Sequence, residues 1–406
     1  MTERVKEWRR FRNEADISIA DIQERVTDKE ILATTAMYGP WQPDGTFDWA
    51  SYDNLVREVV RSGSVPATNV DTTWAIYNDW GLTKEIIWRT AEVAGEESSY
   101  LAEDRPLVVA GVNTNPLDIP ADEVAPRLRG MLAEIDRGLR ERRLTDRIRY
   151  MPMPDRRLYD APSDTKLRVY REIGQAIGEF TDLGMVFFEL DIGIPGFGSN
   201  LNLEEIEGIL SGTPQIQEYK SALISEKSPY RCQYDFADDI LRINVVEAVA
   251  PERVQFSTGN DWFIALARYG KYIDRFGYLL GASQMSPQIF RRWREHVERG
   301  EICALAIEQD LQAAAKDFWT PGNVGIYRHY LAVFLAMTGL IEHPLPHPRC
   351  DERFRVLPAD YFVPLRHAIR LGLVEREDAP GIVRRLVPGA EEMTMAEIER
   401  RIQYMG

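Results

Sequence analysis

Eight short apolar segments, each followed by apolar residues at helical spacing, occupy most of the chain between residues 31 and 300. These segments are apolar almost throughout rather than at every second position, which is typical of parallel strands buried on both faces. Eight strands that alternate with helices predict an α/β fold, the (β/α)8 TIM barrel. The predicted strands are 31–38, 64–71, 106–112, 147–153, 184–190, 214–222, 253–257 and 276–282.

The main competing fold is a doubly wound open sheet. When such a sheet binds a nucleotide, a glycine-rich turn usually follows its first strand. The first predicted strand is followed instead by Tyr38-Gly39-Pro40-Trp41, which lacks that pattern. We therefore favour a barrel over residues 30–299, with an N-terminal helical lead-in over 1–29 and a C-terminal helical extension over 300–406. Helices in the extension are predicted over 302–318, 325–340, 359–373 and 395–404.

Composition and charge narrow the class of protein. The net charge of −15 disfavours nucleic acid as a partner, because phosphate binding needs concentrated positive charge. No apolar run is long enough to cross a membrane, and the charged N-terminus lacks the apolar core of a signal peptide. Cys232, Cys303 and Cys350 lie far apart, and we interpret them as free thiols in a reducing cytoplasm. His343 and His347 flank prolines in an extended segment, so we expect no metal site.

Lys220 is the first candidate catalytic residue, because it lies near the end of the sixth predicted strand. Active sites of barrels form at the carboxyl ends of the strands. A lysine there is partly desolvated, which lowers its pKa and frees the amine to attack a carbonyl. Two alternatives stay open at this point: an interior lysine at the end of a strand, and a lysine in a surface ion pair.

Four segments of the sequence resemble the dihydrodipicolinate synthase / N-acetylneuraminate lyase superfamily. Its members are class I aldolases and lyases built on a barrel with a C-terminal helical extension. The likeness covers roughly residues 30–345, and the order and spacing of the segments carry it. The segments are Gln42–Asp48, Val186–Phe188 with Ile194–Gly196, Ile216–Lys220, and Phe256–Asp261 with 277–287.

The resemblance implies that Lys220 is the Schiff-base lysine, whose amine attacks the ketone of a 2-oxo acid such as pyruvate. The resulting iminium withdraws electrons, so that a neighbouring carbon loses a proton and attacks an aldehyde. The resemblance also implies a small-molecule substrate (an oxo acid or an aldehyde), no cofactor, and a homo-oligomer, either a dimer or a tetramer.

One departure from the family concerns proton transfer. The family usually has a tyrosine on the fifth strand that relays protons, and Phe188 stands at that position here. A phenyl ring exchanges no proton, so another group must replace the relay or the relay is absent. Glu189, Tyr219 and Tyr38 are the candidates, since each lies at or near the carboxyl end of a predicted strand. A structural role is the alternative for each of them.

A second departure concerns the substrate carboxylate. The family holds it with a Gly-Thr-Thr-Gly stretch after the second strand, and Asp71-Thr72-Thr73-Trp74 stands there in this chain. Glycine permits backbone conformations that Asp and Trp resist, so we expect a reshaped anion site. Either the substrate is not plain pyruvate, or Asp71 faces a hydroxyl or an amine, or Asp71 caps the turn.

Further contact candidates follow other strands of the predicted barrel, where the rim of its mouth would be. They are Asn113, Thr114, Asn260, Ser283 and Gln284. Together these residues indicate a Schiff-base lyase or aldolase, or a synthase running in reverse. Two alternatives remain, a dehydratase that uses the same lysine iminium and a barrel that binds a metabolite without turnover.

Overall fold

The computed structural model describes residues 30–144, 147–190, 198–222, 231–260, 272–301, 303–318 and 324–403. The lead-in predicted over residues 1–29 lies outside the described residues, as do Asp261 and the resemblance segment Ile194–Gly196.

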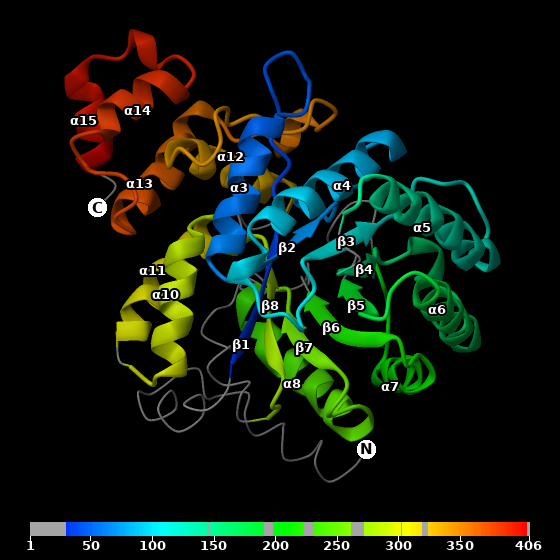
Figure 1. Ribbon diagram of the computed structural model, residues 1–406. Coiled ribbons are helices and arrows are strands. Elements are labelled where there is room, and N and C mark those ends of the chain that lie inside the picture. Colours follow the sequence, from blue (N-terminus) through cyan, green and yellow to red (C-terminus); the bar gives the residue numbers. More distant parts are fainter. Residues whose placement is uncertain are drawn as a thin grey trace.

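Eight parallel strands form a closed barrel in sequence order, which confirms the predicted fold (Figure 1). Most strand residues are buried, because the barrel interior covers one face of the sheet and the helices cover the other. The pairing of β1 with β8, from Ile31 opposite Phe276 to Thr35 opposite Leu280, closes the barrel. The strands are β1 (Ile31–Ala36), β2 (Val65–Thr68), β3 (Val108–Val112), β4 (Ile148–Pro152), β5 (Met185–Leu190), β6 (Ile216–Ala222), β7 (Gln255–Thr258) and β8 (Phe276–Leu280).

Several of the helices that surround the barrel begin at polar capping residues. Asp48 caps the first of them by accepting a hydrogen bond from the Ser51 N–H. Asn202 and Glu205 form a reciprocal capping box at the start of another. The surrounding helices are α3 (Trp49–Arg61), α4 (Trp80–Glu96), α5 (Val124–Glu141), α6 (Ser163–Gly178), α7 (Leu203–Gly212), α8 (Arg231–Val249) and α10 (Pro287–Glu298).

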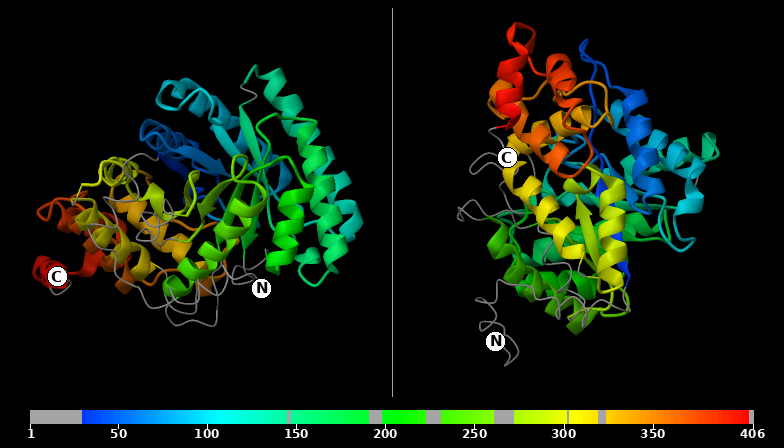
Figure 2. Two further views of the ribbon diagram at one scale, coloured as in Figure 1. Left: turned by 90° about the horizontal axis from the view of Figure 1, so that it is seen from below. Right: turned by 90° about the vertical axis from the view of Figure 1, so that its left-hand side faces the viewer.

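Within the described residues five α-helices follow the barrel, and in Figures 1 and 2 the last three stand to one side of it, away from α5 and α6. Four of them correspond to the predicted helices of the extension. The fifth, α14, was not predicted, because Pro380 and Gly381 at its start are residues typical of turns. Proline is nevertheless favoured in the first turn of a helix. The helices are α11 (Cys303–Phe318), α12 (Val324–Met337), α13 (Phe362–Arg370), α14 (Ala379–Leu386) and α15 (Met395–Gln403).

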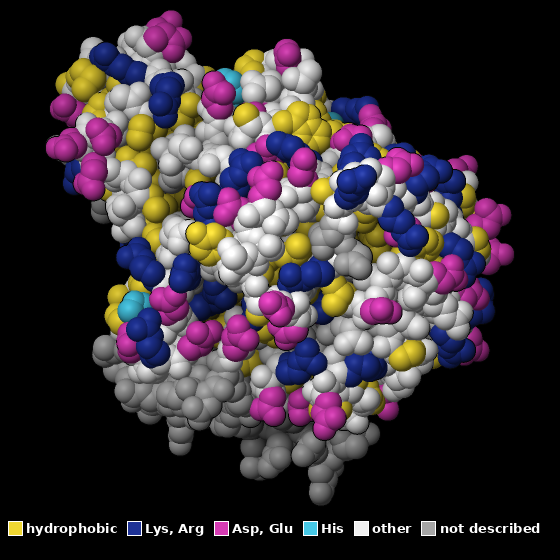
Figure 3. Space-filling model, in the orientation of Figure 1, with side chains coloured by type: hydrophobic (Ala, Val, Ile, Leu, Met, Phe, Trp, Pro, Cys, Tyr) yellow, Lys and Arg dark blue, Asp and Glu magenta, His cyan; other side chains and the backbone are white. Residues whose placement is uncertain are grey.

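The face shown in Figure 3 carries basic and acidic side chains interspersed with one another, with no large area of one sign. None of the helices among the described residues combines the length and the apolar character needed to cross a membrane.

A buried histidine on α12 forms hydrogen bonds with two later segments of the extension. His329 on α12 lies 3.0 Å from the Pro344 carbonyl through Nε2, and its Nδ1 accepts the Val356 N–H at 2.7 Å. These two partners require a neutral imidazole protonated on Nε2. Burial, with a smaller effect from the charge of Arg355, lowers the pKa of His329 to about 4, although the hydrogen bond with the Pro344 carbonyl opposes this shift.

We expect His329 to make the stability of the protein depend on pH. The pKa is lower in the folded state than in the unfolded chain, so the stabilisation is complete above about pH 6.5 and is lost as the pH falls toward 4. Between about pH 7 and pH 4.5 the free energy of unfolding should fall by about 2–3 kcal/mol from this group. Urea unfolding at both pH values measures the difference, and His329→Gln should reduce it. An unchanged difference in that variant would contradict the assignment.

Candidate functional site

Lys220 lies at the carboxyl end of the barrel with its side chain almost fully buried, at 7% exposure. Its strand pairs with β5, where Phe188 is directly opposite, and Lys220 Nζ lies 3.9 Å from the centre of the Phe188 ring. The methylene chain passes close to Gly259, since a Cβ added to that glycine would lie 2.6 Å from Lys220 Cε. The contacts with Phe188 on β5 and with Gly259 after β7 therefore position the Lys220 amine.

Below Lys220, toward the N-terminal end of the barrel, lies a buried polar cluster. Glu218 is two residues earlier on the same strand face and binds Arg149 Nη1 at 3.0 Å. Ser257 donates a hydrogen bond to the other Glu218 oxygen at 2.7 Å. A cavity of about 470 Å³ at this end of the barrel is lined by Arg149, Glu218 and Gln255, among others. The carboxylate nearest along the strand to Lys220 is thus neutralised by an arginine.

Glu189 and Tyr219, two candidates for the proton relay, lie on the opposite face of the sheet from Lys220. Successive strand residues point to opposite faces, so the neighbours of Phe188 and Lys220 point toward the helices. The Tyr219 hydroxyl donates to Glu189, and Arg242 on α8 binds both Glu189 oxygens, at 2.6 and 2.7 Å. Burial and the Glu189 charge raise the pKa of Tyr219 well above its usual value. The structure joins these two residues with each other and does not bring them to the amine.

Tyr38, the third relay candidate, follows β1 and is completely buried. Its hydroxyl donates to the Leu345 carbonyl at 2.8 Å, and its backbone N–H donates to Gln284 Oε1 at 2.6 Å. Burial raises its pKa well above the usual value of a tyrosine. These contacts connect the end of β1 with the extension and with the turn after β8.

The loop after β2 keeps both threonines close to the end of β1. The hydroxyls of Thr72 and Thr73 both donate to the Met37 carbonyl, at 2.9 and 2.7 Å. Trp74 adopts a left-handed φ of 64°, although a side chain opposes that conformation by about 1–2 kcal/mol. The loop therefore has the backbone conformation that favours glycine at Trp74, where the family has its second glycine.

Asp71 faces an arginine of the extension. Arg328 Nη1, on α12, lies 3.4 Å from both the backbone oxygen and Oδ1 of Asp71. The same guanidinium lies 4.3 Å from the centre of the Trp74 ring, and the Arg328 side chain is only 3% exposed. A protein guanidinium, which none of the alternatives for Asp71 named, therefore faces this carboxylate, and Asp71 is not left as an isolated negative charge.

Sequence analysis missed Arg328. A signal was available, because Arg328 is the one arginine in the otherwise largely apolar segment Val324–Met337. A single cation in an apolar helix indicates a buried partner, since an unpaired buried charge is strongly unfavourable. The identity of that partner depends on how the extension packs on the barrel.

The remaining contact candidates differ in their surroundings. Asn260 directly follows Gly259 and is 3% exposed, and neither atom of its side-chain amide has a hydrogen-bond partner among the described residues. Ser283 Oγ lies 2.9 Å from Thr35 Oγ1 and 2.8 Å from the Leu280 carbonyl, inside the contact between β8 and β1. Ser283 is therefore engaged in the protein, whereas the Asn260 amide is unpaired within the described part of the chain.

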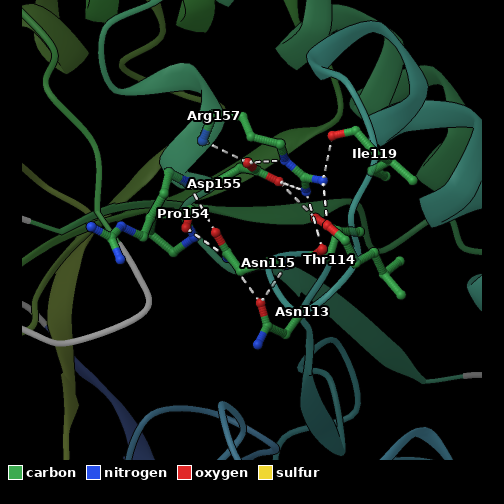
Figure 4. Close-up of polar contacts among 9 residues, drawn as sticks. Asn113, Thr114, Asn115, Ile119, Pro154, Asp155 and Arg157 are labelled. Carbon is green, nitrogen blue, oxygen red and sulfur yellow. Dashed lines mark hydrogen bonds and ion pairs between the residues drawn. The ribbon is translucent and has the colours of Figure 1, made fainter.

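Asn113 belongs to a hydrogen-bond network after β3 and β4 (Figure 4). Its Oδ1 accepts from both the backbone and the side-chain nitrogen of Asn115, at 3.0 and 2.9 Å. The adjacent Thr114 donates to Asp155 at 2.8 Å, and Arg157 pairs with the same carboxylate. These bonds hold this side of the rim in one conformation.

No protein-family model matches the sequence, and no curated protein sequence matches it. Solved structures do match. A dihydrodipicolinate synthase from Thermotoga maritima is 18% identical over 86% of this chain and 100% of its own, with a TM-score of 0.59. A sialic acid aldolase from Ruminococcus gnavus is 14% identical over 85% of this chain and 97% of its own, with a TM-score of 0.59. The chain has the fold of these proteins. The likeness found in the sequence is confirmed at the level of the fold.

We expect Glu189→Gln to destabilise the protein, because it leaves Arg242 buried beside a neutral amide. Loss of one partner of a buried pair costs about 3–5 kcal/mol in free energy of unfolding. Glu134→Gln, in a partly exposed pair with Lys84, is the matched control and should cost less than about 1 kcal/mol. Chemical unfolding of both variants measures the costs, and equal losses would contradict the structural role of Glu189.

Proposed function

We propose that this protein is a Schiff-base-forming lyase or aldolase, or the corresponding synthase, in which Lys220 attacks a small 2-oxo acid or hydroxylated carbonyl compound. The observation that carries the proposal is the buried amine of Lys220 at the carboxyl end of β6 in a closed barrel. A further solved structure supports it: a Ruminococcus gnavus sialic acid aldolase described as a catalytic lysine mutant, 15% identical over 85% of this chain, with a TM-score of 0.61.

The proposed reaction begins when the neutral Lys220 amine forms a bond to the carbonyl carbon. The carbonyl oxygen takes up two protons in all and leaves as water, and the nitrogen becomes part of an iminium. The hydroxyl on the second carbon from the iminium carbon loses its proton and becomes the carbonyl of a released aldehyde, as the bond between that carbon and its neighbour breaks. The electron pair of the broken bond passes to the iminium and leaves an enamine on Lys220, which takes up a proton and is hydrolysed to free the lysine. The synthase direction is the reverse, with a carbon–hydrogen bond broken first and the new carbon–carbon bond formed next.

Phe188 shapes how this reaction proceeds. Its ring covers the amine and restricts water from one side, but it transfers no proton. Because the hydroxyls of Tyr219 and Tyr38 are engaged elsewhere, we propose that protons move through substrate hydroxyls or bound water. A substrate that carries its own hydroxyl groups fits this site better than one without them.

The second candidate function is a barrel that binds a metabolite without turnover. The observation that favours it is the same Phe188 ring, which also interacts favourably with a protonated lysine amine. A protonated amine binds a carboxylate or phosphate but does not attack a carbonyl.

Borohydride reduction distinguishes these functions. With pyruvate and a panel of larger hydroxylated 2-oxo acids, we expect a mass adduct that peptide mapping assigns to Lys220. Lys220→Met should abolish the adduct, whereas Lys84→Met, at a partly exposed surface pair, should leave it unchanged. No adduct with any acid, or an adduct that persists in Lys220→Met, would contradict the Schiff-base proposal. Identification of the products formed without borohydride then distinguishes carbon–carbon cleavage from dehydration.

The pairing of Asp71 with Arg328 predicts opposite effects of two substitutions on carboxylate substrates. Arg328→Met leaves Asp71 unpaired and should weaken trapping of a 2-oxo acid by about tenfold, while Asp71→Asn should strengthen it by a similar factor. A neutral aldehyde is the control, because it carries no charge for the pair to act on. The measurement is the concentration of each carbonyl compound that gives half-maximal trapping. Equal changes for the acid and the aldehyde would show that the pair acts only on the structure.

A further inference from the structure

The turn that joins α10 to α11 places two polar side chains in contact. Gly300 has a left-handed φ of 64° and ends α10, with its N–H donating to the Val297 carbonyl at 3.0 Å. The N–H of Glu301 donates to the His296 carbonyl at 2.9 Å. This pair of bonds is the Schellman motif, in which these two side-chain positions meet and an apolar contact is common. Here the positions hold a carboxylate and an imidazole instead.

A thiol completes the group. Cys303 is the first residue of α11, and its Sγ lies 3.2 Å from His296 Nδ1 and 3.7 Å from Glu301 Oε2. The same Nδ1 is in contact with Glu301 Oε2. The three donor atoms all lie within 4.8 Å of one another, and the side chains of His296 and Glu301 are 25% and 40% exposed. The group is therefore compact and open to solvent.

The arrangement does not fit a nucleophilic triad. In a triad the imidazole uses one nitrogen toward the nucleophile and the other toward the carboxylate. Here the thiol and the carboxylate both approach the same nitrogen, Nδ1. Three electron-pair donors that converge on one region are typical of ligands around a cation.

We propose that His296, Glu301 and Cys303 form a binding site for a divalent metal ion of the zinc class. A thiolate, an imidazole and a carboxylate are ligands that Zn²⁺ accepts, and three protein ligands leave a fourth position for water. Tetrahedral zinc bonds of about 2.0–2.3 Å separate the ligand atoms by roughly 3.3–3.7 Å. The distances from the sulfur, 3.2 and 3.7 Å, lie close to that range, and only the contact between His296 and Glu301 has to widen.

The charges at the site suit a divalent cation. A carboxylate and a thiolate together carry two negative charges, and the imidazole binds metal in its neutral form. Arg299 Nη1 lies 3.7 Å from the other carboxylate oxygen of Glu301, and it is itself paired with Glu295 at 3.4 Å. The arginine contacts the oxygen that the metal does not need, so both interactions fit together.

Metal at this position would connect the last helix around the barrel with the first helix of the extension. The site cannot be recognised from the sequence spacing. Four residues separate His296 from Glu301 and one residue separates Glu301 from Cys303, and this spacing matches no common zinc pattern. The three ligands come together only because the chain reverses at Gly300.

Cobalt binding tests the proposal on the reduced, full-length protein without an affinity tag. Titration with Co²⁺ should give one equivalent bound, with the intense visible bands of a tetrahedral site and a thiolate-to-cobalt band in the near ultraviolet. Cys303→Ser should abolish the thiolate band, and His296→Gln should weaken affinity by more than about tenfold. Cys350→Ala is the matched control, because Cys350 is a buried free thiol elsewhere, and it should leave the spectrum unchanged.

A second measurement needs no variant. Zinc at one equivalent should slow the alkylation of Cys303 by iodoacetamide by about tenfold or more, since a metal-bound thiolate is a poorer nucleophile. Peptide mapping follows Cys303 and Cys350 in the same sample. The proposal is overturned if the thiolate band is absent, if it persists in Cys303→Ser, or if zinc leaves the rate at Cys303 unchanged. None of these results depends on the reaction proposed for Lys220.

Discussion

Closure of the barrel by the pairing of β1 with β8 is the constraint on which the site depends. It brings residues almost 250 positions apart into one contact, in which Gln284 binds both the Tyr38 N–H and the Ala36 carbonyl. Closure buries the inner face of every strand and the surrounding helices bury the outer face, so a polar side chain on either face needs a partner. The Glu218–Arg149 and Glu189–Arg242 pairs meet this requirement on the two faces of the sheet. Lys220 lies on the same face as Glu218, two residues further along β6.

Local patterns in the sequence predict most of the barrel, because a continuous apolar run is a property of each strand by itself. The contact between Lys220 and Phe188 could also have been predicted, since the two residues were assigned to neighbouring strands near the same end of the barrel. Strand alternation could have placed Glu189 and Tyr219 on the other face, because each is adjacent in sequence to a residue of the site. The partner of Arg328 could not be predicted, because its contact with Asp71 spans 257 positions of the sequence and depends on how the extension packs on the barrel.

The extension contributes to the mouth of the barrel rather than only covering its side. Arg328 from α12 contacts both Asp71 and the ring of Trp74, and the Leu345 carbonyl accepts the Tyr38 hydroxyl. These contacts hold the loop after β2 in a left-handed conformation that a tryptophan would not adopt by itself. The residues at positions 71 and 74, where the sequence differs from the superfamily that it resembles, therefore form one contact group with the helix that packs on them.

The buried pair beneath Lys220 makes the two ends of the barrel electrostatically dependent on each other. Residues at the N-terminal end of such barrels usually serve stability alone. Here Arg149 cancels a carboxylate only two residues from the amine, on the same strand face. A mutation at that remote end would change the electric field at the amine without touching any atom of the mouth. In the reaction proposed for Lys220, substitutions at residues 149 and 218 would therefore change the reactivity of the amine while the residues at the mouth of the barrel stay the same.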